Sequence, residues 1–213
     1  SQERLFEINT LLRAKEIPEM PVYLDSPLAI KLTDVYHKHS ECFNENARAR
    51  IKSGDDIFDF PGLHVTSETD ESKAILQSPN PKIIIAGSGM SNGGRIIHHE
   101  INYLPNYGNT LLLTGYQSVG TLGRLIEEGM KVVHINGQEV PVKAHVEKIG
   151  GYSGHKDSDH LVEFVSATRD TVEKVFIVMG EPKSSLFLSQ KIRDNLGVET
   201  FTPNAGDSVI IDC

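Results

Sequence analysis

Residues 83–100 read IIIAGSGMSNGGRIIHHE, and this stretch decides how the chain folds. Its apolar run stops at a turn rich in glycine, serine and asparagine, and an amphipathic segment begins directly after the turn. This order is typical of a buried strand that leads through a loop into the N-terminus of a helix. Backbone amides at such a place point toward a bound anion, and the helix dipole adds to the attraction. The sequence therefore predicts a phosphate-binding turn, with tight packing as the alternative explanation of its glycines.

This turn matches neither of two common nucleotide-binding motifs. No Lys-Ser or Lys-Thr pair follows it, as a Walker A motif requires. No third glycine stands where a dinucleotide-binding fingerprint needs one. The kind of phosphate that the turn binds must be inferred from the rest of the chain.

Strands and helices alternate along the remainder of the sequence. Short apolar runs predict strands at 21–25, 110–114 and 175–179, and alternating residues predict further strands within 131–151. Helical spacing and caps predict helices at 2–15, 28–51, 67–76, 121–128, 157–167 and 182–196. In the third of these helices, Ser67 or Thr69 is the expected cap. The alternation implies an α/β fold in which helices cover parallel sheets.

Composition excludes several classes of protein. The chain has 213 residues, 38% of them hydrophobic, and no apolar run approaches the roughly 20 residues of a membrane span. Its net charge of -8 argues against charge-driven binding of nucleic acid, although a site that contacts a few phosphates remains compatible with it. Two cysteines cannot form a disulfide framework, and the N-terminus shows no signal-peptide pattern. A cytoplasmic protein is expected.

A second tight turn, YSGHKD at 152–157, places a hydroxyl, an imidazole and an ammonium group at a strand-to-helix corner. A histidine at this place, His155, is suited to proton transfer. The alternative is a surface histidine that caps the N-terminus of the helix.

Other histidines carry less weight. The run HKHSEC at 37–42 approaches the rhythm of a binuclear zinc motif. It falls within a predicted helix, however, where residues two apart do not share a face, so exposed helix surface is expected. His98 and His99 are adjacent, and at most one of them faces the first turn.

Several motifs, in their order along the chain, resemble the β-CASP branch of metallo-β-lactamase-fold ribonucleases, which includes RNase J and the endonuclease of pre-mRNA 3′-end processing. The similarity covers nearly the whole chain and rests on segments 21–29, 54–58, 71–73, 88–99, 115–123 and 151–157. The last of these segments matches motif B of the family. The resemblance implies that the histidine of this motif lies near the metals and assists proton transfer.

The resemblance implies a β-CASP domain over 1–138, with a parallel sheet and flanking helices. The C-terminal portion of a metallo-β-lactamase αββα domain would follow over 139–213. It implies metal-dependent hydrolysis of RNA phosphodiester bonds, in RNA processing or decay, with two zinc ions in the full-length parent. His155 would transfer the proton. RNA phosphate would be bound by Ser88, Gly89, Ser91, Gly93, Gly94, Arg95, Ser153 and Lys156.

Two departures from the family pattern matter. The main metal-ligand motifs precede the β-CASP domain in the family, and none is visible here, so the chain looks like a C-terminal fragment. We expect it to be inactive and to hold no zinc alone. In addition, Met179 stands at the family's histidine ligand in motif C, and a thioether is a poor partner for zinc. No metal site is complete.

A non-catalytic β-CASP protein, acting as an RNA-binding or scaffold partner, is the main alternative. Met179 favours it, and the Ser153 and His155 turn opposes it. A small-molecule enzyme with a flavodoxin-like phosphate site gives no reason for the second turn. The expected partners are RNA, the missing N-terminal region and a second copy in a homodimer, through an exposed sheet in 139–213. The two turns are expected to face one cleft.

Overall fold

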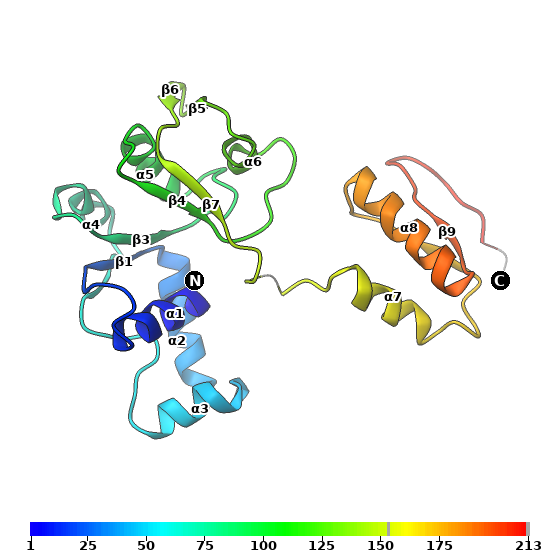
Figure 1. Ribbon diagram of the computed structural model, residues 1–213, viewed down its shortest axis with the longest axis horizontal. Coiled ribbons are helices and arrows are strands. Elements are labelled where there is room, and N and C mark those ends of the chain that lie inside the picture. Colours follow the sequence, from blue (N-terminus) through cyan, green and yellow to red (C-terminus); the bar gives the residue numbers. More distant parts are fainter. Residues whose placement is uncertain (153, 212–213) are drawn as a thin grey trace. The chain divides into compact units, whose positions relative to one another are not determined.

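The computed structural model describes residues 1–152 and 154–211. The chain divides into two compact units, Ser1–Tyr152 and Ser153–Cys213 (Figure 1). Each unit is α/β with parallel strand pairs, which confirms the predicted fold class. A search of the described helices finds none with the length and apolar character that a membrane crossing requires.

The first sheet of unit 1 has β1 (Val22–Asp25) at its centre, between β2 (Leu63–Val65) and β3 (Ile83–Ala86). Both pairings are parallel, and Leu24 lies opposite Val65 on one side and Ile85 on the other. Val22 and Leu24 are completely buried, as expected of a central parallel strand that is covered on both faces. The carboxyl ends of three strands therefore meet at one edge of this sheet.

Two helices complete the N-terminal part of unit 1. Helix α1 (Gln2–Arg13) buries Leu5 in the core beside β1. Helix α2 (Pro27–Lys38) begins directly after β1, where the Ser26 hydroxyl accepts a hydrogen bond from the amide of Ala29 at 3.3 Å. Proline in the first turn of α2 is favourable because its missing N–H has no partner there in any case.

The single helix predicted over 28–51 is wrong. Helix α2 ends early, a 3₁₀ turn η1 (Ser40–Cys42) follows, and α3 (Glu45–Lys52) begins anew. The cause is local, because the side chain of Asn44 accepts a hydrogen bond from the amide of Ala47 at 2.9 Å and so starts a second helix. Apolar spacing alone does not show this break.

The histidine-rich run 37–42 lies at that break. Its residues are exposed apart from the half-buried Ser40, as predicted, but only the first two belong to an α-helix. His37 Nε2 lies 3.1 Å from Asp56 Oδ1, which gives that histidine an ordinary surface partner.

The predicted helix at 67–76 consists of α4 (Thr69–Ala74) and the 3₁₀ turn η2 (Ile75–Gln77). Its cap differs from the prediction. The Glu71 carboxylate accepts hydrogen bonds from the amides of Ser67 and Glu68, at 2.8 and 2.9 Å. The helix is therefore capped by Glu71 reaching back from its first turn, in the manner of a capping box.

The second half of unit 1 contains two smaller sheets. Strand β4 (Thr110–Leu113) pairs in parallel with β7 (His145–Lys148), and β5 (Val132–Ile135) forms an antiparallel hairpin with β6 (Gln138–Pro141). Two helices pack here, α5 (Ile96–Tyr103) and α6 (Leu122–Glu127). Since β6 pairs with β5 and β7 pairs with β4, both within unit 1, the compact unit extends past residue 138. The boundary at 138/139 follows the family's domain pattern and stays a prediction.

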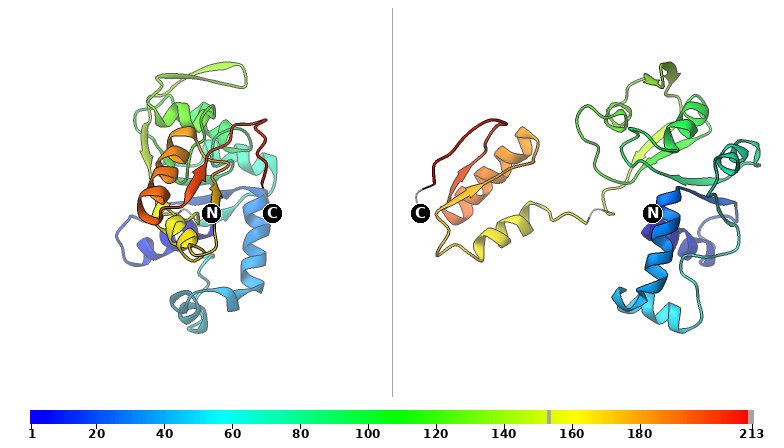
Figure 2. Two further views of the ribbon diagram at one scale, coloured as in Figure 1. Left: turned by 90° about the vertical axis from the view of Figure 1, so that its right-hand side faces the viewer. Right: turned by 180° about the vertical axis from the view of Figure 1, so that it is seen from behind.

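Unit 2 is a small layer of helices on a two-stranded parallel sheet. Its elements are α7 (Ser158–Ser166), β8 (Lys174–Phe176), α8 (Pro182–Leu196) and β9 (Glu199–Phe201). Figure 2 shows α8 lying alongside the strands. The core contains Val165 and Ile192. The predicted helix at 182–196 is confirmed and ends at Gly197, whose φ of 69° is typical of a C-terminal glycine cap.

Candidate RNA-contacting loops and the His155 cavity

The loop from Gly87 to Gly94, between β3 and α5, is closed on itself. The Ser88 amide donates to the Gly93 carbonyl at 3.2 Å, and the Ser91 amide donates to the Ser88 carbonyl at 3.1 Å. Gly94 has a φ of 71°, and a Cβ there would lie 2.6 Å from the Gly87 carbonyl oxygen. Position 94 therefore requires glycine for two reasons. Its backbone is left-handed, and two segments of the chain approach each other closely there.

A second loop, residues 115–123, is hydrogen-bonded to the first one. The Gly123 amide donates to the Met90 carbonyl at 3.0 Å, and the Leu122 amide donates to Asn92 Oδ1 at 3.2 Å. Gln117, completely buried, donates to the Gly89 carbonyl at 2.9 Å. These bonds join two of the motifs that carry the family resemblance into one surface.

Ser91 is buried and hydrogen-bonded within unit 1. It is 3% exposed, and its Oγ lies 2.5 Å from Glu100 Oε1. Burial raises the pKa of Glu100 to about 7, against the lowering effect of the Ser91 hydrogen bond. The hydroxyl predicted to bind phosphate is thus in contact with a buried carboxyl group.

Arg95 is likewise hydrogen-bonded within unit 1. Its guanidinium donates to Asp25 Oδ1 at 2.6 Å and to the Thr66 and Ser67 carbonyls, both at 2.7 Å. These contacts occupy both terminal nitrogens of the side chain. The assignment of Arg95 to RNA phosphate therefore stays a prediction.

Asp25 is the centre of this network, and sequence reasoning missed it. Its side chain is fully buried at the end of β1 and also meets His99 Nε2 at 2.6 Å and the Ser72 hydroxyl at 2.6 Å. Burial alone would raise the pKa of Asp25, but hydrogen bonds from Ser72, Thr66, His99 and Arg95 hold it below its usual value. The available signal was an aspartate at the carboxyl end of a buried strand, where polar side chains of neighbouring strands meet.

The adjacent histidines are thereby distinguished. His99 faces this network and is buried, whereas His98 is exposed. Of the predicted phosphate-binding residues, Ser88, Gly89 and Gly94 are exposed on the first loop and Gly93 is half-buried.

In unit 2, the second predicted turn leads into α7. Ser153 lies outside the described residues, and His155 and Lys156 are exposed. The helix is capped by Asp157, which accepts from the His160 amide at 3.0 Å and contacts the His160 ring at 2.7 Å. The backbone and side-chain hydrogen bonds from His160 lower the pKa of Asp157, and the contact with Asp157 raises the pKa of His160. Since capping falls to Asp157, His155 is not the N-cap.

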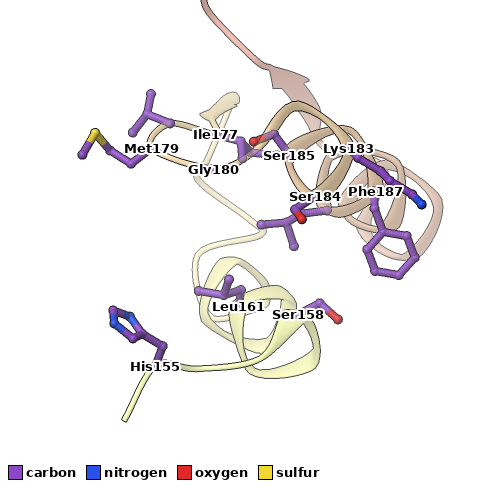
Figure 3. Close-up of a pocket in the computed structure, with 12 residues that line it drawn as sticks. His155, Ser158, Leu161, Ile177, Met179, Gly180, Lys183, Ser184, Ser185 and Phe187 are labelled. Atoms are coloured by element: carbon purple, nitrogen blue, oxygen red, sulfur yellow. The ribbon is translucent and has the colours of Figure 1, made fainter. Parts of the chain in front are cut away.

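His155 lines an open cavity of about 650 Å³ within unit 2. The opposite wall is the segment after β8, which includes Met179 and Gly180 (Figure 3). Met179 is fully exposed and has a φ of 65°, unusual for a residue with a side chain. The two positions that correspond to motifs B and C of the resemblance therefore line one cavity.

The zinc implied by the resemblance does not fit the described residues. Among them, no group of three or more His, Cys, Asp or Glu side chains is placed to hold a metal ion. The cavity offers one imidazole beside a thioether, whereas a catalytic zinc ion takes about three nitrogen, sulfur or carboxylate ligands from protein.

Comparisons with known proteins agree with this architecture. Residues 1–126 match the Beta-Casp domain, and residues 139–203 match the Zn-dependent metallo-hydrolase RNA specificity domain. The chain belongs to the β-CASP family of metallo-β-lactamase-fold ribonucleases.

Three relatives illustrate the similarity. Ribonuclease TTHA0252 of Thermus thermophilus is 36% identical over 89% of this chain and 43% of its own length. Transcription termination factor FttA of Methanosarcina mazei is 31% identical, over 94% and 32%. An RNase J-like protein of Methanocaldococcus jannaschii is 32% identical, over 97% and 46%. The chain thus spans less than half the length of these relatives.

Proposed function

We propose that this chain is part of a metal-dependent ribonuclease, in which it supplies RNA-contacting loops and a histidine that transfers protons. The observation that carries the proposal is the cavity in which His155 and the Met179 segment line opposite walls. This cavity lies in the region that matches an RNA specificity domain. Cleavage of RNA phosphodiester bonds, in processing or decay, is proposed for the longer protein.

His155 is the residue proposed to act on the reacting atoms. Its exposed ring borders the cavity, and an imidazole can both give and accept a proton near neutral pH. Lys156 and Ser153 are proposed to contact RNA phosphate beside it.

The loop at 87–94 is proposed to contact RNA through its exposed part. Gly89, Gly93 and Gly94 are proposed to present backbone amides and Ser88 its hydroxyl, and both kinds of group suit phosphate oxygens. For Ser91 and Arg95, the bonds to Glu100 and Asp25 support an indirect role, in which they hold the loop in shape.

Zinc enters the proposal only for the longer protein. The description of the matched RNA specificity domain names zinc. The described residues do not supply its ligands, so we assign none here and propose that two ions are held elsewhere in the parent. The chain alone is proposed to be inactive.

Changing His155 to alanine in the longer protein tests the proposed function. Removing a positioned acid–base group should lower the rate of cleavage by roughly 10²–10⁴-fold, with RNA binding largely retained. Cleavage of a labelled RNA is measured with added Zn²⁺ or Mn²⁺. His134→Ala, at an exposed position on the β5–β6 hairpin, is the matched control. Equal rates for the wild type and His155→Ala would remove His155 from the mechanism.

A non-catalytic RNA-binding or scaffold protein is the second candidate. Met179 at the motif C position is the observation that favours it, since a thioether binds zinc weakly. In the same assay, RNA binding without cleavage above background in the wild type would establish this candidate and exclude the first.

Further partners complete the proposal. Exposed apolar side chains in unit 2, such as Phe164 and Val178, support self-association of the isolated chain. A homodimer is proposed on this basis, and a contact with a preceding metallo-β-lactamase region is proposed on the family pattern. A cytoplasmic location is proposed from the low cysteine content of the chain. Light scattering over a range of concentrations tests the dimer, and a monomer at high concentration would contradict it.

A further inference from the structure

We propose that the N-terminal part of α8 forms a nucleotide subsite for single-stranded RNA, with a backbone phosphate on its first turn and a base on Phe187. The proposal rests on the proposed function for its substrate class. It adds a second RNA contact to the His155 cavity, at residues that the family resemblance does not single out.

The first turn of α8 has amides to offer. Its first intrahelical bond runs from the Ser185 amide to the Glu181 carbonyl at 2.9 Å, so the amides of Lys183 and Ser184 precede the bonded ladder. Glu181, the N-cap residue, makes no side-chain capping bond to them. Uncapped amides at a helix N-terminus attract anions such as phosphate.

Ser185 is an independent indication of a ligand. It is 7% exposed, and its hydroxyl has no hydrogen-bond partner among the described residues. The hydroxyl therefore keeps its hydrogen-bonding capacity for a group in the cavity. The side chain lines the cavity, and its Oγ lies 2.4 Å from the point that a Cβ on Gly180 would occupy. Only glycine at 180 therefore fits against this hydroxyl, because a side chain there would collide with it.

Lys183 and Phe187 extend the subsite along the helix. They are four residues apart, which places them on one face of α8, and Figure 3 shows both on the same side of the helix. Lys183 is exposed and has no ion-pair partner within the described ranges, and Phe187 is 59% exposed. Lys191 lies one turn further, with its Nζ 5.7 Å from the centre of the Phe187 ring, and it is ion-paired with Asp159 at 2.5 Å.

This combination is typical of surfaces that bind single-stranded nucleic acid. Cations contact the backbone, and an exposed ring stacks a base without requiring a particular sequence. A continuous apolar interface would not place the exposed Lys183 one turn from the ring. We therefore favour RNA over a protein partner as the occupant.

The absence of tryptophan from the chain makes a direct test possible. Phe187→Trp introduces a single tryptophan, whose fluorescence a stacked base quenches. Titration with a single-stranded oligoribonucleotide should quench Phe187→Trp. It should leave Phe164→Trp unchanged, since Phe164 is 75% exposed on the other helix. Polyphosphate, which has no bases, should compete with the RNA without quenching. Equal quenching at both positions, or none at 187, would overturn the subsite.

Affinity measurements separate the two parts of the subsite. Phe187→Leu should weaken binding by roughly 5- to 150-fold, the range found for loss of one stacked base. Lys183→Gln should weaken binding and reduce the slope of log affinity against log salt by about 0.7. Lys174→Gln, at the start of β8, is the matched control and should change neither. Native affinity and salt slope in both test variants would contradict the proposal.

The test of the subsite and the test of the proposed function can fail independently of one another. Cleavage by the longer protein together with native RNA affinity in both variants would reject the subsite alone. Quenching at position 187 without any cleavage would reject the ribonuclease and retain the subsite.

Discussion

The loop at 87–94 in unit 1 and the cavity of unit 2 use their polar residues in opposite ways. The loop turns Ser91 inward to Glu100 and Arg95 inward to Asp25, and a second loop holds its backbone. The cavity leaves His155 and Lys183 exposed at its wall and the hydroxyl of Ser185 without a described partner. A glycine-rich turn can thus use its side chains to hold its own shape, whereas the cavity of unit 2 exposes polar side chains at its wall.

The largest effect is expected at Asp25, where the internal network of unit 1 is most concentrated. Asp25→Ala leaves Arg95 partly buried without its carboxylate, and breaking a buried ion pair in this way typically costs about 3–5 kcal/mol of unfolding free energy. Denaturant unfolding measures the loss, and Asp34→Ala on the exposed face of α2 is the matched control. An equal, small effect of both substitutions would show that the network does not stabilise the loop.

A pair of residues with positive φ sharpens the contrast. Gly94→Ala brings a Cβ within 2.6 Å of the Gly87 carbonyl oxygen in addition to its unfavourable φ, so a loss of about 1–3 kcal/mol is expected. Met179→Gly, at a φ of 65° and full exposure, relieves strain without removing a contact and should gain up to about 1 kcal/mol. Thermal unfolding monitored separately in each unit measures both. Similar losses at the two positions would contradict the difference between the loops.

Glu100 predicts a pH dependence confined to unit 1. Its pKa is raised to about 7 in the folded chain from an ordinary value of 4.5, so the folded state binds more protons than the unfolded state between these values. Stability from this group is complete below pH 4.5 and is lost as the pH rises toward 7, with a slope of at most about 1.4 kcal/mol per pH unit.

Glu100→Gln should abolish that slope while keeping the shape of the side chain. Unfolding measured from pH 5 to pH 8 should then show the variant gaining on the wild type as the pH rises. A parallel pH dependence in both proteins would mean that Glu100 does not titrate in this range. The Asp25 pKa is lowered instead, so its contribution is lost as the pH falls below the ordinary range of a carboxyl group.

The smallest effect is expected for metal binding at position 179. Met179→His in the longer protein replaces a thioether by a far better zinc ligand and should increase the zinc retained after dialysis. The zinc content by elemental analysis is compared with that of Met179→Leu, which removes the sulfur and adds no ligand. Equal zinc in all three proteins would show that position 179 lies away from the metal.

Local patterns predicted much of the fold and less of the site. Helix α8 and its Gly197 end follow directly from helical spacing and a terminal glycine, because these signals lie within one segment. The break near Asn44 was missed because a single side-chain cap outweighed a long apolar stripe. The roles of Asp25, Ser91 and Arg95 were not predictable from spacing, because their partners come from distant segments that only the folded sheet brings together.

The parallel order of the first sheet also sets how fast unit 1 can fold. Strand β1 pairs on both sides with strands that follow much later in the chain, and Asp25 meets Arg95 across 70 positions. Each of these contacts requires closure of a long loop before it gives any stability, and folding slows as such contacts come to dominate. In unit 2, β8 meets β9 with only α8 between them. During refolding, unit 2 should therefore become protected first, and the aspartate network of unit 1 should form last.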